Sequence, residues 1–169
     1  MHIRNFLGAL SLSLPLVWGA GVAVADDMSM SGPVAKLGSL EISGAFARAT
    51  LPGAKTGGGY FTIVNTGQTD DRLIGVASPI AAKAELHTMS MKGGIMEMRP
   101  ATDGIDIPAG KSVELTPSGL HVMFVNIKQP FKQGSTIPVT LTFAKAGDVK
   151  LTLEVLGIAA KAPMAGMAI

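Results

Sequence analysis

The chain has 169 residues, with 14 lysines and arginines, 12 aspartates and glutamates, and no cysteine. This length is enough for one domain with a substantial core, and the formal net charge of +2 argues against a nucleic-acid-binding protein, which needs a clustered basic face. A fold without cysteine must rely on its hydrophobic core, and any metal site in it must use Met, His or carboxylate ligands.

Residues 1–25 are predicted to be a secretory signal peptide. Arg4 provides a positive start, residues 6–19 form a short apolar stretch interrupted by Pro15, and Ala23-Val24-Ala25 is a small-residue cleavage signal. An uncleaved membrane anchor is the alternative, although the apolar stretch is short for a span. We therefore expect export to the periplasm, with no membrane span after removal of the signal.

The remaining chain divides into three predicted parts: a flexible lead-in over 26–39, a folded domain over 40–156 and a flexible tail over 157–169. Within the domain, short runs of β-branched and aromatic residues alternate with Gly, Pro, Asn and Asp, and no stretch shows a sustained helical period. This pattern predicts an all-β sandwich or barrel. The expected strands are 40–48, 58–65, 71–77, 83–91, 95–99, 111–116, 120–127, 136–143 and 149–156, with 103–110 as a turn-rich crossing.

Soft metal donors are concentrated between residues 85 and 123. This stretch holds both histidines that follow the signal peptide, His87 and His121, together with Met89, Met91, Met96, Met98 and Met123. Side chains alternate along a strand. His121 and Met123 should therefore share one face of their strand, while Leu120, Val122 and Phe124 fill the core from the other.

The strand over 83–91 and its return over 95–99 predict a hairpin that repeats this arrangement. Its outer face carries Lys83, Glu85, His87, Met89 and Met91, whereas Ala84, Leu86 and Thr88 lie on the opposite face. If Gly93-Gly94 is the turn, Met89 is opposite Met98; if Lys92-Gly93 is the turn, His87 is opposite Met98. Both registers place His87 and Met98 on one face.

Two imidazoles with two or more thioethers are a donor set that selects Cu(I). We expect the ligands to be His87, Met98, His121 and Met123. Met89 is the first substitute, Met91 and Met96 are rim sulfurs that could help transfer the ion, and Glu85 and Glu97 are solvated strand charges. The alternative is that the methionines only fill gaps in packing. A blue-copper centre is excluded because it needs a cysteine, and no Ser/His/Asp arrangement supports an enzyme.

The spacing of these residues resembles the signature of the periplasmic copper chaperones of the PCuAC family. The resemblance covers about residues 40–156 and includes Gly94-Ile95-Met96-Glu97-Met98-Arg99-Pro100, Ile107-Pro108-Ala109-Gly110 and Gly119-Leu120-His121-Val122-Met123. It implies a cupredoxin-like Greek-key β-sandwich that binds Cu(I) through the same four residues. It also implies delivery of copper to the dinuclear copper centre of cytochrome c oxidase, through the copper-bearing subunit or a thiol-bearing assembly protein. The tail offers Met164 and Met167 but no His, which does not favour the second, Cu(II) site that some members carry.

Two other functions remain open from the sequence. The chain could be a periplasmic copper-buffering or tolerance protein without a dedicated acceptor. It could also be a metal-free secreted β-sandwich that acts as an interaction domain, in which case it would bind no copper.

Overall fold

The computed structural model describes residues 34–163 of the chain. The predicted signal peptide and the terminal methionines Met164 and Met167 lie outside this range. The described part is built of strands and turns, and none of its residues belongs to a helix that is long and apolar enough to cross a membrane. The predicted all-β fold is therefore confirmed.

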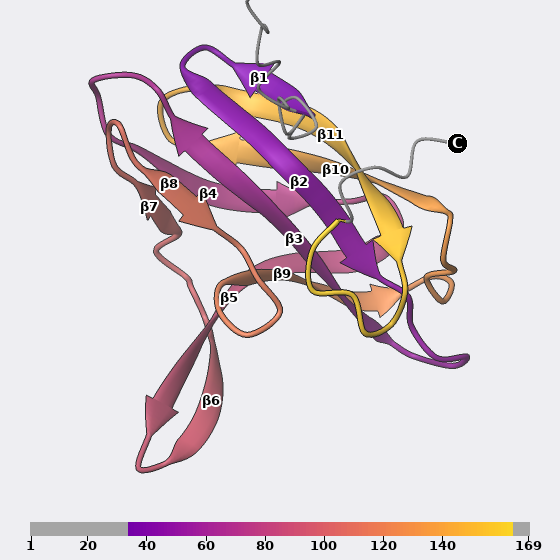
Figure 1. Cartoon of the computed structure of the whole chain (residues 1–169). Coiled ribbons are helices and arrows are strands. Elements are labelled where there is room, and N and C mark those ends of the chain that lie inside the picture. The colour runs from indigo at the N-terminus through magenta and orange to yellow at the C-terminus, as the bar shows by residue number, and fades with distance from the viewer. Residues whose placement is uncertain (1–33, 164–169) are drawn as a thin grey trace, which may run out of the picture.

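Eleven strands follow one another along the chain (Figure 1). They are β1 (Ala35–Leu37), β2 (Leu40–Arg48), β3 (Thr56–Asn65), β4 (Asp71–Ala77), β5 (Ala81–Lys92), β6 (Ile95–Pro100), β7 (Ile105–Ile107), β8 (Ser112–Glu114), β9 (His121–Ile127), β10 (Thr136–Phe143) and β11 (Gly147–Leu156).

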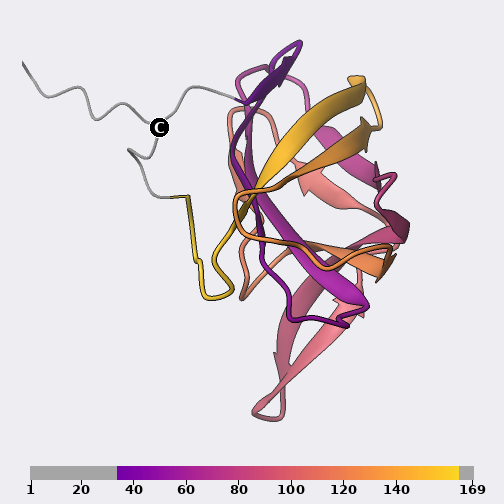
Figure 2. The same cartoon turned by 90° about the vertical axis from the view of Figure 1, so that its right-hand side faces the viewer.

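The strands pair in the order β6-β5-β9-β3-β2-β11-β10-β4-β7, while β1 pairs with β2 and β8 with β3. All pairs are antiparallel except β11 with β2. The sheet curls so that β2 and β3 lie over β10 and β4 in two layers, and the β5–β6 hairpin extends beyond them (Figures 1 and 2). The hairpin is thus joined to the sandwich along one edge, through β9.

The core lies between the layers and explains the alternation read from the sequence. Fully buried apolar side chains come from both layers, among them Phe61, Leu73, Leu141 and Leu153. On β9, Val122 and Phe124 are completely buried in this core, and on β5 Leu86 joins them. The odd-numbered residues from Lys83 on β5 and from His121 to Val125 on β9 are therefore turned to the outer face, whereas Ala81 and Ile127 at the far end of the pair belong to the core.

Two short strands were not expected from the sequence. Ala35–Leu37, assigned above to the flexible lead-in, pairs with β2 through Leu37 opposite Leu40. Ile105–Ile107, assigned to a turn-rich crossing, pairs with β4 and buries both isoleucines. Runs of three residues are too short to show a period, so only their long-range partners define them as strands.

A β-bulge in β2 changes which residues face the core. The register shifts between Ser43 and Phe46, and Gly44 adopts a φ of 58°, a value that glycine reaches without the steric cost of a Cβ. Before the bulge Ile42 faces the core; after it Ala45 and Ala47 do. Phe46 and Arg48 are consequently turned to the outer face that continues into β3, β9 and β5.

Candidate metal centre

The two histidines come from neighbouring strands at the base of the hairpin. β5 and β9 pair with His87 directly opposite His121 and Glu85 opposite Met123. Directly opposite residues project to the same side of a sheet. The ring centroids of His87 and His121 are 5.7 Å apart, with an interplanar angle of 48°. Both residues are buried, at 8% and 6% exposure, although neither belongs to the apolar core.

The two nitrogens of His87 have different environments. Nε2 lies 3.0 Å from a carboxylate oxygen of Glu85 and can donate its proton to it. Nδ1 is buried and has no hydrogen-bond partner among the described residues. Buried polar atoms almost always have a partner, so an unpaired imidazole nitrogen is suited to bind a ligand.

Glu85 therefore does more than the solvated strand charge that the sequence indicated. It pairs with Lys83 as well as with His87. The hydrogen bond from Lys83, followed by that from His87, lowers the pKa of the Glu85 carboxyl below its ordinary value. The carboxylate stays ionised at neutral pH and holds the His87 ring in one orientation.

His121 is oriented by the main chain instead. Its Nδ1 lies 3.0 Å from the carbonyl oxygen of Gly119, which accepts the proton. This leaves the Nε2 lone pair of His121 for a ligand. The preceding turn is held by hydrogen bonds from Gly119 N to Thr116 O and from Thr116 N to Leu120 O.

The hairpin register decides where the sulfurs lie. Lys92 pairs with Ile95, so Gly93-Gly94 is the two-residue turn. Their φ angles of 58° and 80° are those of a type I′ turn. Met89 is therefore opposite Met98, and Met91 is opposite Met96. His87 is opposite Pro100, which places Met98 diagonal to His87 on the same face.

Four of the predicted donors line one groove. Met89, Met98, His121 and Met123 share it with Gly58, Tyr60 and Arg48, while His87 is not part of its lining. Gly58 of β3 lies directly opposite Met123 of β9, so the base of the groove at this point is a residue without a side chain. A Cβ at Gly58 would collide with the hydroxyl of Tyr60.

Tyr60 and Arg48 form the side of the groove away from the hairpin. Burial raises the pKa of Tyr60, and the nearby Arg48 charge partly offsets this. The Arg48 guanidinium carbon lies 5.7 Å from the centre of the Tyr60 ring, and its Nε donates to the carbonyl of Ala160. Arg48 thus links β2 to the segment after β11, whose Ile158 reaches the groove.

The sequence did not indicate Tyr60, Arg48 or Gly58 as site residues. A lone Tyr or Arg in a strand has no metal-binding signature, and the face on which Arg48 lies depends on the bulge at Gly44. The run Gly57-Gly58-Gly59 was the available signal, because glycine inside a strand often marks a close approach of other groups. Here the side chains of Phe131, Tyr60 and Leu153 lie against Gly57, Gly58 and Gly59, in that order.

The donor chemistry restricts the metals that could bind. Among residues 34–163, no group of three or more His, Cys, Asp or Glu side chains could hold a metal ion. The donors that share a face or groove with the two histidines are the thioether sulfurs of Met89, Met98 and Met123. Thioethers are soft, neutral donors that favour Cu(I) over zinc, calcium or magnesium.

Comparisons of the sequence found a matching family and a curated relative. The family model described as "Putative lipoprotein LpqE-like" matches residues 40–155. A curated relative, "Putative lipoprotein Lxx21020" of Leifsonia xyli subsp. xyli, is 31% identical over 140 residues, 83% of each chain.

Solved structures of PCuAC domains have the same cupredoxin-like fold. The copper-bound PCuAC domain from PmoF2 aligns with a TM-score of 0.62 and 30% identity over 73% of this chain and 97% of that domain. The Cu(I) form of DR1885 from Deinococcus radiodurans aligns with a TM-score of 0.56 and 29% identity over 67% of this chain and 75% of that one.

Proposed function

Because the chain belongs to the LpqE-like family and has the fold of the PCuAC domains, we propose that it is an extracytoplasmic Cu(I) carrier. Two of the matching structures, the PmoF2 domain and DR1885, are described as bound to copper or Cu(I). The proposed ligands are His87, Met98, His121 and Met123, with Met89 as the substitute thioether.

The observation that carries this proposal is the buried Nδ1 of His87, which has no hydrogen-bond partner within residues 34–163, beside a second buried histidine. Leaving such an atom without a partner costs free energy of about 1–3 kcal/mol. Binding a metal through Nδ1 would remove that cost. His87 donates from Nε2 to Glu85, and His121 donates from Nδ1 to the Gly119 carbonyl. We therefore assign the remaining nitrogens, His87 Nδ1 and His121 Nε2, as the ligating atoms.

The sulfur ligands follow from the same face. Met123 lies beside His121 on β9, and Met98 reaches the same groove from β6. Met123 is partly buried, whereas Met98 is 47% exposed. Copper in such a site would be held by buried imidazoles on one side and by accessible thioethers on the other. This arrangement suits an ion that must be released to a partner.

Delivery, and not turnover, is the proposed activity. An accessible thioether can be displaced by a thiolate of an acceptor while the other ligands still hold the ion, so the copper is never free in solution. We propose that the acceptor is the dinuclear copper centre of cytochrome c oxidase, in its copper-bearing subunit or through a thiol-bearing assembly protein. No step of this exchange requires oxidation or bond cleavage in a substrate.

The proposed location is outside the cytoplasm, in the periplasm. Support comes from the predicted signal peptide and from the lipoprotein described in Leifsonia. A lipid attached through cysteine is not part of this proposal, because the 169 residues contain no cysteine.

The test is a Cu(I) titration of the purified protein against a competing chelator, beside His87→Ala, Met98→Ala, His121→Ala and Met123→Ala. We expect one tightly bound equivalent and a marked loss of affinity in each variant. Absence of binding, or binding unchanged by all four substitutions, would refute the site. Transfer to a purified oxidase copper domain then separates a carrier from a buffering protein, which would hold copper without passing it on.

A further inference from the structure

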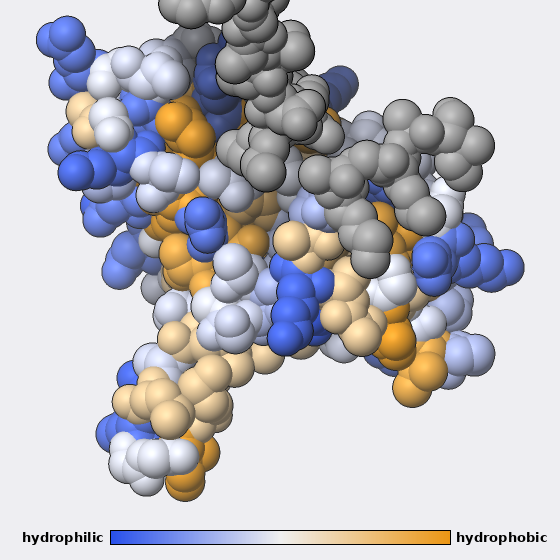
Figure 3. Space-filling view, viewed as in Figure 1, coloured by the Kyte–Doolittle hydropathy of each residue, from blue (hydrophilic) through white to orange (hydrophobic). Residues whose placement is uncertain are grey.

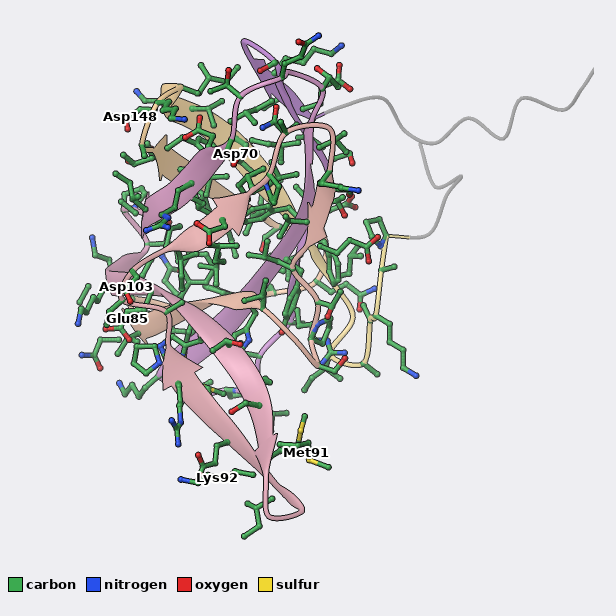
Figure 4. The ribbon with its side chains drawn as sticks, turned by 90° about the vertical axis from the view of Figure 1, so that its left-hand side faces the viewer. Asp70, Glu85, Met91, Lys92, Asp103 and Asp148 are labelled. Atoms are coloured by element: carbon green, nitrogen blue, oxygen red, sulfur yellow. The ribbon has the colours of Figure 1, made fainter. Side chains whose placement is uncertain are left out.

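The β5–β6 hairpin segregates its side chains completely between its two faces. From the register, one face between His87 and Pro100 carries His87, Met89, Met91, Met96, Met98 and Pro100, and the other carries Thr88, Ser90, Lys92, Ile95, Glu97 and Arg99. The charged side chains of this stretch are thus all on one face, where Glu97 pairs with Arg99. Figure 4 shows Met91 and Lys92 extending to opposite sides of the hairpin.

The methionines form two cross-strand pairs that lead from the tip toward the histidines. Met91 is opposite Met96 next to the turn, and Met89 is opposite Met98 one step closer to His87. Successive pairs on one face of a strand are about 7 Å apart. Side chains directly opposite each other have Cβ atoms about 4.5–5.5 Å apart. At this separation the sulfur atoms of two flexible thioethers can both reach one ion.

Packing does not explain the pair at the tip. The hairpin projects away from the sandwich, and hydrophobic side chains cover much of the side that faces the viewer (Figure 3). Met91 is 69% exposed and Met96 is 49% exposed, and neither contributes to the core. The usual role of methionine as a filler of gaps in the core therefore does not apply to them.

Among the donors on this face, exposure is highest at the tip and lowest at the histidines. Met91 is the most exposed, Met98 is half-exposed, and His87 and His121 are buried. An ion arriving from solvent would meet the Met91–Met96 pair first and the histidines last.

We propose that Met91 and Met96 form a second, weaker Cu(I) site at the tip of the hairpin, through which copper enters and leaves the main site. This inference rests on the proposed function for the site to which the ion passes. At each step a new bond from copper to a thioether sulfur or, in the main site, to an imidazole nitrogen forms as a copper–sulfur bond at the tip breaks; the copper remains Cu(I), and no proton or electron is transferred. Two neutral thioethers near water bind more weakly than two thioethers with two imidazoles, so the ion moves inward.

The test uses Cu(I), and Ag(I) as a redox-inert probe, with protein carrying 13C-labelled methionine methyl groups. We expect the first equivalent to shift the methyl signals of Met98 and Met123. Excess metal should then shift those of Met91 and Met96 in fast exchange. The double variant Met91→Leu/Met96→Leu preserves the shape of the tip and removes both sulfurs. It should keep the affinity for the first equivalent but take up Cu(I) from a chelator several-fold more slowly.

The matched control is Ile95→Leu, an apolar change at the same tip but on the other face, which should leave uptake unchanged. If the first equivalent binds normally while the Met91 and Met96 methyl signals stay fixed under excess metal and uptake is not slowed, this inference is wrong although the proposed function stands. Loss of the first equivalent in the double variant would also overturn it, because the pair would then belong to the main site. Failure of the parent to bind either metal would instead refute the proposed function.

Discussion

His87 and His121 lie directly opposite each other on β5 and β9, with ring centroids 5.7 Å apart. They lie on strands that are not consecutive in the sequence, and the β5–β9 pairing brings them together. Each ring is oriented by a different acceptor, the Glu85 carboxylate or the Gly119 carbonyl.

Replacing Glu85 with Ala should weaken Cu(I) binding without unfolding the protein. Loss of the carboxylate that orients a metal-binding histidine typically lowers affinity by about 10–100-fold, whereas a partly exposed ion pair contributes only about 0–1 kcal/mol to stability. Competition titration and thermal unfolding measure the two effects. Glu85→Gln, which retains an acceptor for His87 Nε2, should recover most of the affinity.

The matched control is Glu97→Ala, which removes a carboxylate from the other face of the same hairpin. It should bind copper as the parent does. Equal affinities in Glu85→Ala and Glu97→Ala would mean that the Glu85 contact does not position His87.

Adjacent residues on β9 should separate copper binding from stability. Met123→Leu removes a sulfur and keeps a similar volume, so we expect loss of copper affinity and a small change in the free energy of unfolding. Phe124→Ala opens a cavity in the core, where Phe124 is fully buried, and should cost about 3–5 kcal/mol. Urea denaturation with copper titration measures both. If Met123→Leu bound copper normally, Met123 would not be a ligand.

Adding a methyl group at Gly58 should disturb the groove. The new Cβ would collide with the Tyr60 hydroxyl, so the ring must move, and overpacking of this kind costs about 1–3 kcal/mol. We expect lower stability and weaker copper binding in Gly58→Ala. At Gly75 a Cβ would meet the Thr142 side chain at an ordinary 3.6 Å. Gly75→Ala is therefore the control, and similar behaviour of the two variants would contradict the prediction.

Tyr60 should make stability fall at alkaline pH. Burial raises the pKa of Tyr60 above its ordinary value of 10.0, so the unfolded chain loses the phenolic proton first. Unfolding is then favoured as pH rises above about 10, while below that pH both states are protonated and the effect vanishes. The chain has one tyrosine, so ultraviolet absorbance reports its titration alone. Arg48→Met should raise the pKa further; a pKa at or below 10 in the parent would refute the assignment.

Much of the site could be predicted from local alternation. The period of two along residues 120–124 determined that His121 and Met123 face away from Val122 and Phe124, because the core accepts only the apolar set. The same logic separated His87 and Met89 from Leu86. The absence of cysteine restricted soft donors to thioethers. These conclusions depend on neighbouring residues of one strand, which the order of amino acids specifies directly.

The tertiary structure decided what depends on pairing between distant segments. The sequence allowed two hairpin registers, and the type I′ turn at Gly93-Gly94 selected Met89 opposite Met98. The bulge at Gly44 reversed the alternation of β2 and turned Arg48 toward the groove, a change that one extra residue produces and no periodicity reveals. Glu85 and His87 are neighbours on one face of a strand, but only the fold buries the His87 ring and so makes the Glu85 carboxylate the acceptor that orients it. Registers, bulges and buried polar contacts depend on which strands pair. The amino-acid order therefore supplied the donor residues, and the fold decided which of their atoms face one another.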